Sequence, residues 1–256
     1  MELFNYNIQF HFMKDLFSSH SPDYSRYRPS YPKELFSFLR KLCQYRERAW
    51  DCGTGNGQVA GELSNFFEQV YATDISINQL SQAIEKENIH YSKQPAEKTS
   101  FPDDSFDLMT VGQAVHWFDF DKFYTEVKRV LKKDAVIAIF GYALFRSNAE
   151  TDATIDHFYN NIIGPHWSPE RRYLEERYET IPFPFKEIGA PKLEMKQQWT
   201  FERLTGYLNT WSAVKSFERE KGQNPVELIK KELFESFGEV GPINFPILLR
   251  VGKNSG

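Results

Sequence analysis

The chain has 256 residues, of which 41% are hydrophobic and 26% charged, and its formal net charge is −4 at pH 7. This composition excludes disordered, collagen-like and coiled-coil proteins, and it is sufficient for one large hydrophobic core with a small appended subdomain. The negative charge provides no overall field that attracts phosphate backbones, so we expect no nucleic-acid partner. The 23 Phe and 13 Tyr residues indicate an unusually heavy use of flat side chains.

Cysteine content and hydropathy predict the location of the protein. Cys43 and Cys52 are the two cysteines, which is too few for a disulfide scaffold or a cysteine zinc cluster and indicates a reducing compartment. The first residues lack a basic region followed by an apolar one, and the longest apolar stretch, residues 135–145, is far shorter than the roughly 20 residues that span a bilayer. We therefore expect a cytoplasmic protein without a membrane segment, a metal site or an obligate protein partner.

Strand and helix patterns alternate over the first 145 residues. A helix is expected at residues 32–44, because Leu35, Phe36 and Leu39 share one helical face. The further predicted strands are 48–51, 69–73, 89–92, 106–111 and 135–142, and the further predicted helices run from the glycines after residue 51 to about 67, from 77 to 87 and from 120 to 131. Such alternation implies right-handed crossovers and a parallel sheet with helices on both faces.

The second half has a different pattern. Residues 149–185 are rich in aromatic side chains, charges and prolines, which is too irregular for another strand–helix unit and predicts an inserted cap. Strands are expected at 192–200 and 245–251, around helices at 201–221 and 225–237. The two late strands fit a closing antiparallel pair.

The predicted fold class is α/β. We expect a doubly wound, Rossmann-like and mostly parallel sheet of seven strands, with an antiparallel last strand and an inserted helical cap. The whole chain, 1–256, is interpreted as a single domain. Its predicted parts are an N-terminal lid segment (1–32), a cofactor-binding core (33–145), the cap (149–190) and the C-terminal strands and helices (191–256).

A glycine-rich turn follows the first predicted strand, in the sequence Trp-Asp-Cys-Gly-Thr-Gly-Asn-Gly at residues 50–57. Dinucleotide-binding loops have the spacing G-x-G-x-x-G and place a pyrophosphate at the helix N-terminus. Here Gly53, Gly55 and Gly57 have the shorter spacing G-x-G-x-G, and Asp51 precedes them. A carboxylate at this position would repel a pyrophosphate, but it suits a ligand that carries an ammonium group and a sulfonium. The alternative is a turn made only for packing.

Two further acidic positions follow the next strands. Asp74 comes at the end of the second strand, where a carboxylate can accept hydrogen bonds from both hydroxyls of an adenosine ribose. The alternative is a helix N-cap, a role that Ser76 would serve equally well. Ala96 and Glu97 follow the third strand, which would place them beside an adenine. Taken alone, Glu97 would be interpreted as a solvated loop acid.

Together, residues 49–142 resemble the class I S-adenosylmethionine-dependent methyltransferases. The acid-plus-glycine loop, the acid after the second strand, the Ala-Glu pair and the Phe-Asp start of the fourth strand occur in the order of that family. The resemblance implies S-adenosylmethionine as cofactor. It implies that the methionine moiety contacts Asp51, Gly53 and Gly55, the ribose Asp74, and the adenine Ala96 and Glu97.

Three segments outside these motifs, 24–32, 113–119 and 181–185, resemble the subgroup that contains trans-aconitate methyltransferase-like proteins. That resemblance places the Gln-Ala-Val-His-Trp-Phe stretch, residues 113–118, beside the transferred methyl group. Gln113 would line the cofactor or the substrate, or it would be a polar residue of the core.

His116 has three interpretations. Its unperturbed pKa near neutrality suits a general base, but it could equally orient the substrate or bond to the backbone beside Trp117. Metal binding is less favoured, because His116 and Asp119 occur without an H-E-x-x-H motif or a cysteine pair.

Arginines and tryptophans are the candidates for the acceptor site. Arg26 and Arg28 occur in the aromatic lid segment, and guanidinium groups bind carboxylates with two hydrogen bonds; the alternative is surface solvation. Trp117 and Trp211 are candidates for the walls of the substrate pocket, although a core role is nearly as well supported for Trp211.

A second arginine pair, Arg171 and Arg172, lies in the predicted cap. Glu175 and Glu176 follow it closely, which suggests a helix face whose charges pair with one another. Arg26 and Arg28 are therefore the stronger candidates for binding an acidic acceptor.

The functional prediction is methyl transfer from S-adenosylmethionine to a small-molecule acceptor, for which a carboxylate is one option. One alternative is a noncatalytic S-adenosylmethionine-binding protein. An NAD(P)-dependent oxidoreductase shares the fold class but requires the wider glycine spacing. A nucleic-acid methyltransferase is disfavoured by the negative charge and by the Gln-Ala-Val-His sequence after the fourth strand.

Overall fold

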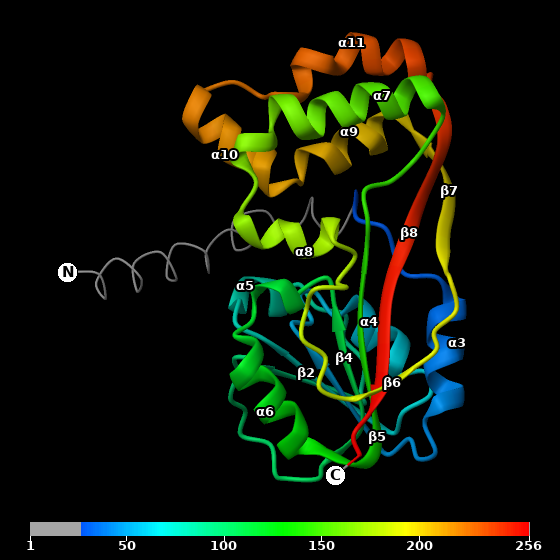
Figure 1. The fold of residues 1–256 in the computed structure, drawn as a ribbon, viewed down its shortest axis with the longest axis vertical. Coiled ribbons are helices and arrows are strands. Elements are labelled where there is room, and N and C mark those ends of the chain that lie inside the picture. The colour runs from blue at the N-terminus through cyan, green and yellow to red at the C-terminus, as the bar shows by residue number, and fades with distance from the viewer. Residues whose placement is uncertain (1–26, 256) are drawn as a thin grey trace, which may run out of the picture.

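The structure, a computed structural model, describes residues 27–255 and consists of a sheet-based half and a helical half (Figure 1). A single sheet lies in the first half, and helices from two separate stretches of the chain form the second. The long strand β8 (Val240–Lys253) runs through both halves.

Within residues 27–255 the sheet has eight strands in the order β3-β2-β1-β4-β5-β8-β6, and β7 pairs with β8 outside this path. The pairs among β1 to β5 are parallel, and β8 pairs antiparallel with β5, β6 and β7. This confirms the predicted Rossmann-like class, with one strand more than the seven expected. The other strands are β1 (Arg48–Cys52), β2 (Gln69–Asp74), β3 (Ile89–Lys93), β4 (Phe106–Gly112), β5 (Leu131–Tyr142), β6 (Lys186–Ile188) and β7 (Glu194–Thr200).

The helices follow the predicted order, and three of them differ from the predicted extent. Their bounds are α3 (Lys33–Leu42), α4 (Gln58–Leu63), α5 (Ile77–Leu80), α6 (Phe120–Val130), α7 (Ala149–His157), α8 (Arg172–Glu175), α9 (Phe201–Asn209), α10 (Ser212–Lys221) and α11 (Val226–Phe237). Short 3-10 segments are η1 (Val115–Trp117), η3 (Gly164–His166) and η4 (Pro169–Arg171), and η2 (Phe158–Ile162) is a π-helix.

Three predicted helices are wrong in extent. The helix expected to run to about residue 67 ends at Leu63. The helix expected at 77–87 ends at Leu80, because the chain then crosses over α4: the Ile84 amide donates to the Asn56 carbonyl at 3.2 Å, and Lys86 Nζ donates to the Gly61 carbonyl at 2.7 Å. The helix expected at 201–221 is interrupted at Thr210, whose hydroxyl donates to the Tyr207 carbonyl at 2.7 Å. Tertiary contacts override helix propensity after Leu80, whereas at Thr210 a local hydrogen bond from a side chain to the backbone accompanies the break.

Hydrophobic clusters cover both faces of the sheet and fill the helical half. On one face Leu35 and Leu39 of α3 and Leu63 of α4 pack against the strands, and on the other Phe123 and Val127 of α6 do. The helical half has its own core of mostly aromatic and branched side chains. That core combines α7, from the stretch predicted as a cap, with α9, α10 and α11 from the C-terminal stretch.

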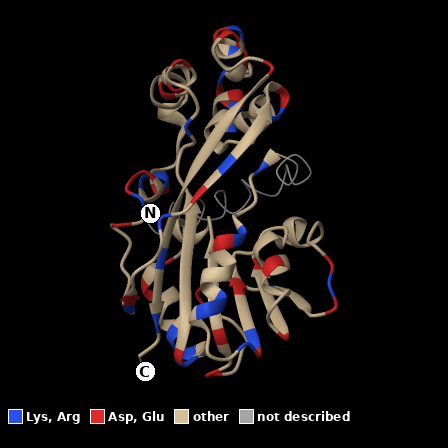
Figure 2. Cartoon of the chain, turned by 90° about the vertical axis from the view of Figure 1, so that its right-hand side faces the viewer, with Lys and Arg blue, Asp and Glu red and all other residues tan. Residues whose placement is uncertain are grey.

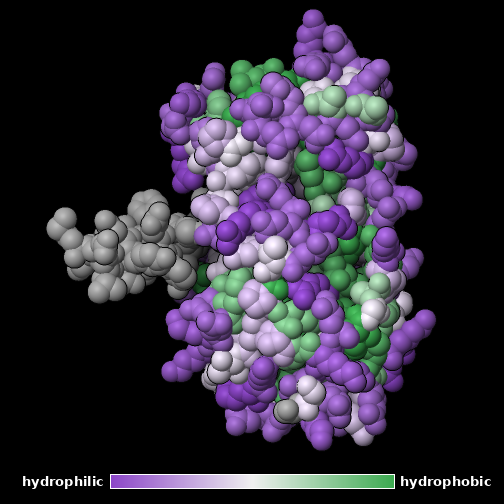
Figure 3. All heavy atoms as spheres, viewed as in Figure 1, coloured by the Kyte–Doolittle hydropathy of each residue, from purple (hydrophilic) through white to green (hydrophobic). Residues whose placement is uncertain are grey.

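The surface is mixed in charge and mostly hydrophilic. Lys and Arg are interspersed with Asp and Glu over both halves (Figure 2), and hydrophilic residues cover most of the face in Figure 3. None of the helices between residues 27 and 255 is long and apolar enough to cross a membrane. The cytoplasmic location and the absence of protein and nucleic-acid partners stay predictions.

Candidate functional site

The glycine turn connects β1 to α4 at the carboxyl end of the sheet. All three glycines have a left-handed backbone, with φ angles of +67° at Gly53, +57° at Gly55 and +80° at Gly57. Residues that carry a Cβ rarely adopt this conformation. A Cβ built on Gly53 would lie 2.7 Å from the Cβ of Ala114, which follows β4. The turn and the segment after β4 are therefore in direct contact, which brings the two predicted halves of the site together.

Asp51 is buried beneath this turn, with 1% of its surface exposed. One oxygen accepts hydrogen bonds from Thr54 Oγ1 at 2.5 Å and from the Ala60 amide at 3.1 Å, and the other accepts from Thr110 Oγ1 at 2.8 Å. Burial raises its pKa to about 6, although these hydrogen bonds favour the charged form. Asp51 thus ties the turn to α4 and β4 and places a carboxylate directly below it.

The raised pKa predicts a specific dependence of stability on pH. Because the folded-state pKa lies above the unfolded value of 3.8, ionised Asp51 destabilises the fold progressively as pH rises from about 4 to 6. We expect the free energy of unfolding of Asp51→Asn, relative to the parent, to increase by about 3 kcal/mol between pH 4 and pH 8. Urea unfolding at both pH values measures this. Asp121→Asn, at an exposed position, is the control, and an Asp51→Asn difference that does not change with pH would contradict the argument.

Asp74 lies at the end of β2 and faces the glycine turn. One of its oxygens accepts a hydrogen bond from the Gly55 amide at 2.9 Å, and the other accepts from the Ser76 amide at 2.8 Å. Each carboxylate oxygen keeps a second lone pair, so Asp74 can accept hydrogen bonds from a ligand as well. The N-cap of α5 is Ser76 and not Asp74, because the Ser76 hydroxyl accepts a hydrogen bond from the Gln79 amide. Ile75, which the sequence analysis did not single out, is 39% exposed next to Asp74 and offers an apolar surface for a flat ring.

The segment after β3 carries Ala96 and Glu97. Ala96 is buried, and Glu97 Oε1 accepts a hydrogen bond from the Asp119 amide at 3.1 Å. Glu97 is therefore half-buried and linked to the segment after β4, so it is not a freely solvated loop acid.

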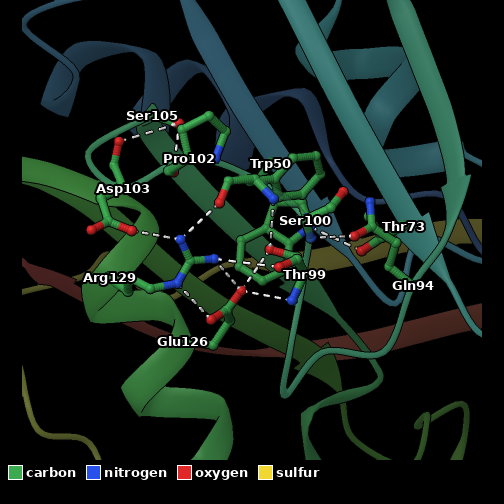
Figure 4. Close-up of polar contacts among 11 residues, drawn as sticks. Trp50, Thr73, Gln94, Thr99, Ser100, Pro102, Asp103, Ser105, Glu126 and Arg129 are labelled. Atoms are coloured by element: carbon green, nitrogen blue, oxygen red, sulfur yellow. Dashed lines mark hydrogen bonds and ion pairs between the residues drawn. The ribbon is translucent and has the colours of Figure 1, made fainter.

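Arg129 and Glu126 of α6 hold this segment in place (Figure 4). Arg129 donates to both oxygens of Glu126, at 2.9 and 2.7 Å, and to the Phe101 carbonyl and Asp103, each at 2.7 Å. Glu126 in turn accepts from the amide and the hydroxyl of Thr99. One partly buried ion pair thus fixes the backbone between residues 99 and 103, just after Ala96 and Glu97.

Gln113 and His116 lie at the carboxyl ends of β4 and β5. Gln113 has a φ of +57°, and its side-chain oxygen accepts from the Tyr142 amide at 2.9 Å. His116 is buried, and its Nδ1 lies 3.3 Å from the hydroxyl of Tyr178. Burial, with a smaller contribution from the charge of Arg171, lowers the pKa of His116 to about 3, so its imidazole is neutral at physiological pH.

Sequence reasoning missed Tyr178. It is fully buried and its backbone is left-handed, with a φ of +62° that follows the +56° of Arg177. A Cβ on Gly141 of β5 would lie 2.9 Å from its hydroxyl. Two consecutive left-handed residues without glycine are uncommon and occur mainly where surrounding structure enforces them. Nothing in the local sequence signals this conformation.

The described end of the lid segment packs between the two halves. Arg28 Nη1 donates to Tyr142 Oη at 2.9 Å, its Nη2 lies 3.4 Å from the Thr210 carbonyl, and its guanidinium lies over the ring of Tyr207. Tyr31 packs edge-on against Phe140 at 4.8 Å. Arg28 therefore links β5 to α9.

Arg26, the other predicted acceptor-binding arginine, lies outside the described residues.

The two predicted tryptophans occupy different environments. Trp117 is half-buried in η1, and its ring centroid lies 5.0 Å from that of His116. Trp211 is 3% exposed within the helical core, 5.6 Å from Trp167 between ring centroids. Trp117 therefore lies in the segment after β4, next to His116, whereas Trp211 belongs to the core of the helical half.

This parallel sheet, with a glycine turn after its first strand and an acid after its second, defines a Rossmann-like α/β protein whose ligands bind at the carboxyl ends of the strands. A family model described as a methyltransferase domain matches residues 50–139. A Dictyostelium discoideum protein whose name places it among the methyltransferases is 30% identical over 249 residues, which cover 93% of this chain and 95% of that protein.

A solved structure from Anaeromyxobacter dehalogenans, named as a type II methyltransferase, is 39% identical, with a TM-score of 0.82. The match covers 89% of this chain and 98% of that one. An uncharacterized methyltransferase of Mycobacterium tuberculosis is 33% identical over 183 residues, which cover 71% of this chain and 70% of that protein.

The chain therefore belongs to the class I S-adenosylmethionine-dependent methyltransferases, of the type 11 kind. It is a methyltransferase enzyme and its cofactor is S-adenosylmethionine, as predicted. This excludes the oxidoreductase alternative and decides against a noncatalytic binding protein.

Proposed function

We propose that this enzyme transfers the methyl group of S-adenosylmethionine to a carboxylate oxygen of a small molecule. The observation that carries the proposal is the pairing of a cofactor site at the glycine turn with a buried, neutral His116 beside it. An imidazole whose pKa is about 3 is a weak base at neutral pH. A carboxylate is already anionic at that pH and needs no base, so it matches this environment better than a hydroxyl or an amine.

The residues at the glycine turn fit the cofactor. The left-handed glycines let the backbone approach a ligand closely, and both oxygens of Asp74 retain lone pairs for ribose hydroxyls. We assign the methionine moiety to Gly53 and Gly55, with the carboxylate of Asp51 below them as the complement of its positive charges. The adenine is assigned to the space between Ile75 and the pair Ala96 and Glu97.

The proposed chemistry is an in-line displacement. When bound, S-adenosylmethionine supplies a methyl group on a positively charged sulfur. A carboxylate oxygen bonds to the methyl carbon while the carbon–sulfur bond breaks and its electron pair stays on sulfur, which gives a methyl ester and S-adenosylhomocysteine. The chain's own contribution is positioning, which can supply about 7–11 kcal/mol of the barrier. Gln113, His116 and Trp117 line the acceptor side in this proposal, and His116 acts as a neutral hydrogen-bonding group.

The pH dependence of kcat tests this proposal. With saturating S-adenosylmethionine and a panel of mono-, di- and tricarboxylic acids, we expect transfer of tritiated methyl into an alkali-labile product. The kcat should vary less than about twofold between pH 6.5 and 8.5, because no group on the acceptor or on His116 titrates there. An acceptor that must lose a proton would instead give a kcat that rises about tenfold per pH unit below its pKa. The methyl ester of each acid is the control and should accept no further methyl group at that position.

A further inference from the structure

Arg171, in the short segment η4, is held rigidly at the edge of the helical half. Its Nε donates to Tyr159 Oη at 2.8 Å, and Tyr159 Oη donates to Glu175 at 2.7 Å. The guanidinium lies over the ring of Trp167, 4.5 Å from the centroid, and 5.5 Å from that of Tyr159. The side chain therefore has a fixed orientation, although it is only half-buried.

The terminal nitrogens of this guanidinium are not used by the part of the chain that the structure describes. Among residues 27–255, no Asp or Glu oxygen lies within 4.0 Å of Arg171, and Nε is the atom through which it hydrogen-bonds. Arg129, Arg146 and Arg250 each face a carboxylate of the chain at 2.7 to 2.9 Å. A guanidinium presents two parallel N–H groups that match the two oxygens of a carboxylate. Arg171 is thus preorganised for an anion that the described chain does not supply.

The position of Arg171 relates it to the acceptor side of the site. η4 packs against η1, which carries His116 and Trp117. The charge of Arg171 acts on both His116 and the buried Tyr178. The segment η4, which carries this cation, therefore lies against the segment after β4, where Gln113, His116 and Trp117 are proposed to line the acceptor side.

We propose that Arg171 binds a carboxylate of the methyl acceptor through its two terminal nitrogens, an assignment that rests on the proposed carboxylate function. Arg28, which the sequence favoured, instead contacts Tyr142, Thr210 and Tyr207 and ties the lid segment to both halves. Each carboxylate oxygen bound to Arg171 keeps a lone pair for attack on the methyl carbon. The methyl ester that forms is neutral, so the charge-assisted hydrogen bonds weaken on product formation, which favours release of the product over the substrate.

Steady-state kinetics of four variants test the assignment with the best acid of the panel as the probe. We expect Arg171→Gln to raise the KM for the acid about 10- to 100-fold, as for loss of hydrogen bonds to a charged group. Arg171→Lys should recover part of this, because it keeps the charge but loses the paired geometry. Arg172→Gln is the matched control, since Arg172 is exposed and contacts Tyr173, and its KM should stay within twofold. Arg28→Gln should lower the free energy of unfolding, because Arg28 ties the lid segment to both halves. Its effect on the KM for the acid should be smaller than that of Arg171→Gln.

Calorimetry with S-adenosylmethionine separates the outcomes. The Kd for the cofactor should be the same in the parent and in Arg171→Gln, which also shows that the variant is folded. An unchanged KM in Arg171→Gln, with acids still methylated by the parent, would overturn the assignment and leave the proposed function standing. If the parent binds S-adenosylmethionine but methylates no acid, the carboxylate function fails and the role of Arg171 fails with it.

Discussion

Asp74→Ala should weaken S-adenosylmethionine binding by about 100- to 1,000-fold. Asp74 is the proposed acceptor for both ribose hydroxyls, and each hydrogen bond to a charged group contributes about 1.5–3 kcal/mol. The variant also releases the Gly55 and Ser76 amides from their partner, so the glycine turn loses a brace. Isothermal calorimetry with S-adenosylmethionine and with S-adenosylhomocysteine measures the effect, which should be equal for both because they share the ribose.

Two companion variants sharpen this result. Asp74→Asn keeps the size of the side chain but replaces one acceptor oxygen with a donor, and we expect an intermediate loss. Asp121→Ala, at an exposed position in the first turn of α6, should leave both affinities within twofold. Retention of parental affinity by Asp74→Ala would remove the ribose assignment and move the cofactor elsewhere on the sheet edge.

Gly53→Ala should destabilise the fold by about 2–5 kcal/mol and reduce cofactor binding below detection by calorimetry. The left-handed backbone costs an L-residue about 1–2 kcal/mol, and overpacking costs a further 1–3 kcal/mol. Here the new methyl group would meet the Cβ of Ala114 at 2.7 Å and the ring of Phe118 at 3.3 Å. Neither neighbour is the free end of a flexible side chain, so the segment after β4 would have to move. Chemical denaturation measures the stability.

Substitutions at two other glycines separate the backbone cost from the overpacking cost. Gly222 has a φ of +70° but open space around its Cβ position, so Gly222→Ala should show the backbone cost alone. Gly189 has open space and no left-handed φ, and Gly189→Ala should be neutral or slightly stabilising. Equal losses in Gly53→Ala and Gly222→Ala would mean that the contact with Ala114 costs nothing.

Much of the sheet-based half was predictable, because its signals are local. Alternating apolar runs and amphipathic stretches located β1 to β5, α3 and α6, and the acid-plus-glycine turn marked the carboxyl end of β1, where we propose that the cofactor binds. Each of these depends on residues within one strand–helix unit. The helix predicted at 77–87 failed for the opposite reason, since Ile84 and Lys86 bond to the neighbouring turn and to α4, and periodicity does not report contacts of that kind.

The acceptor side was less predictable. Arg28 and Arg171 are both arginines among aromatic residues, and only tertiary structure shows that the first contacts its own chain through both terminal nitrogens while the second keeps them available. Glu175, read from the sequence as a direct partner of the second pair, contacts Arg171 through Tyr159. The left-handed backbone of Tyr178 likewise follows from its burial among distant segments.

The strand β8 holds the two halves of the molecule together. Residues 240–246 of β8 pair with β7 in the helical half, and residues 247–253 pair with β5 in the sheet-based half. A cut between the halves would therefore strip β5 of its antiparallel neighbour and expose a new sheet edge, with the risk of aggregation that such edges carry. Any chimera designed to exchange acceptor specificity with a relative must consequently keep β8 whole and replace only the helices attached to it.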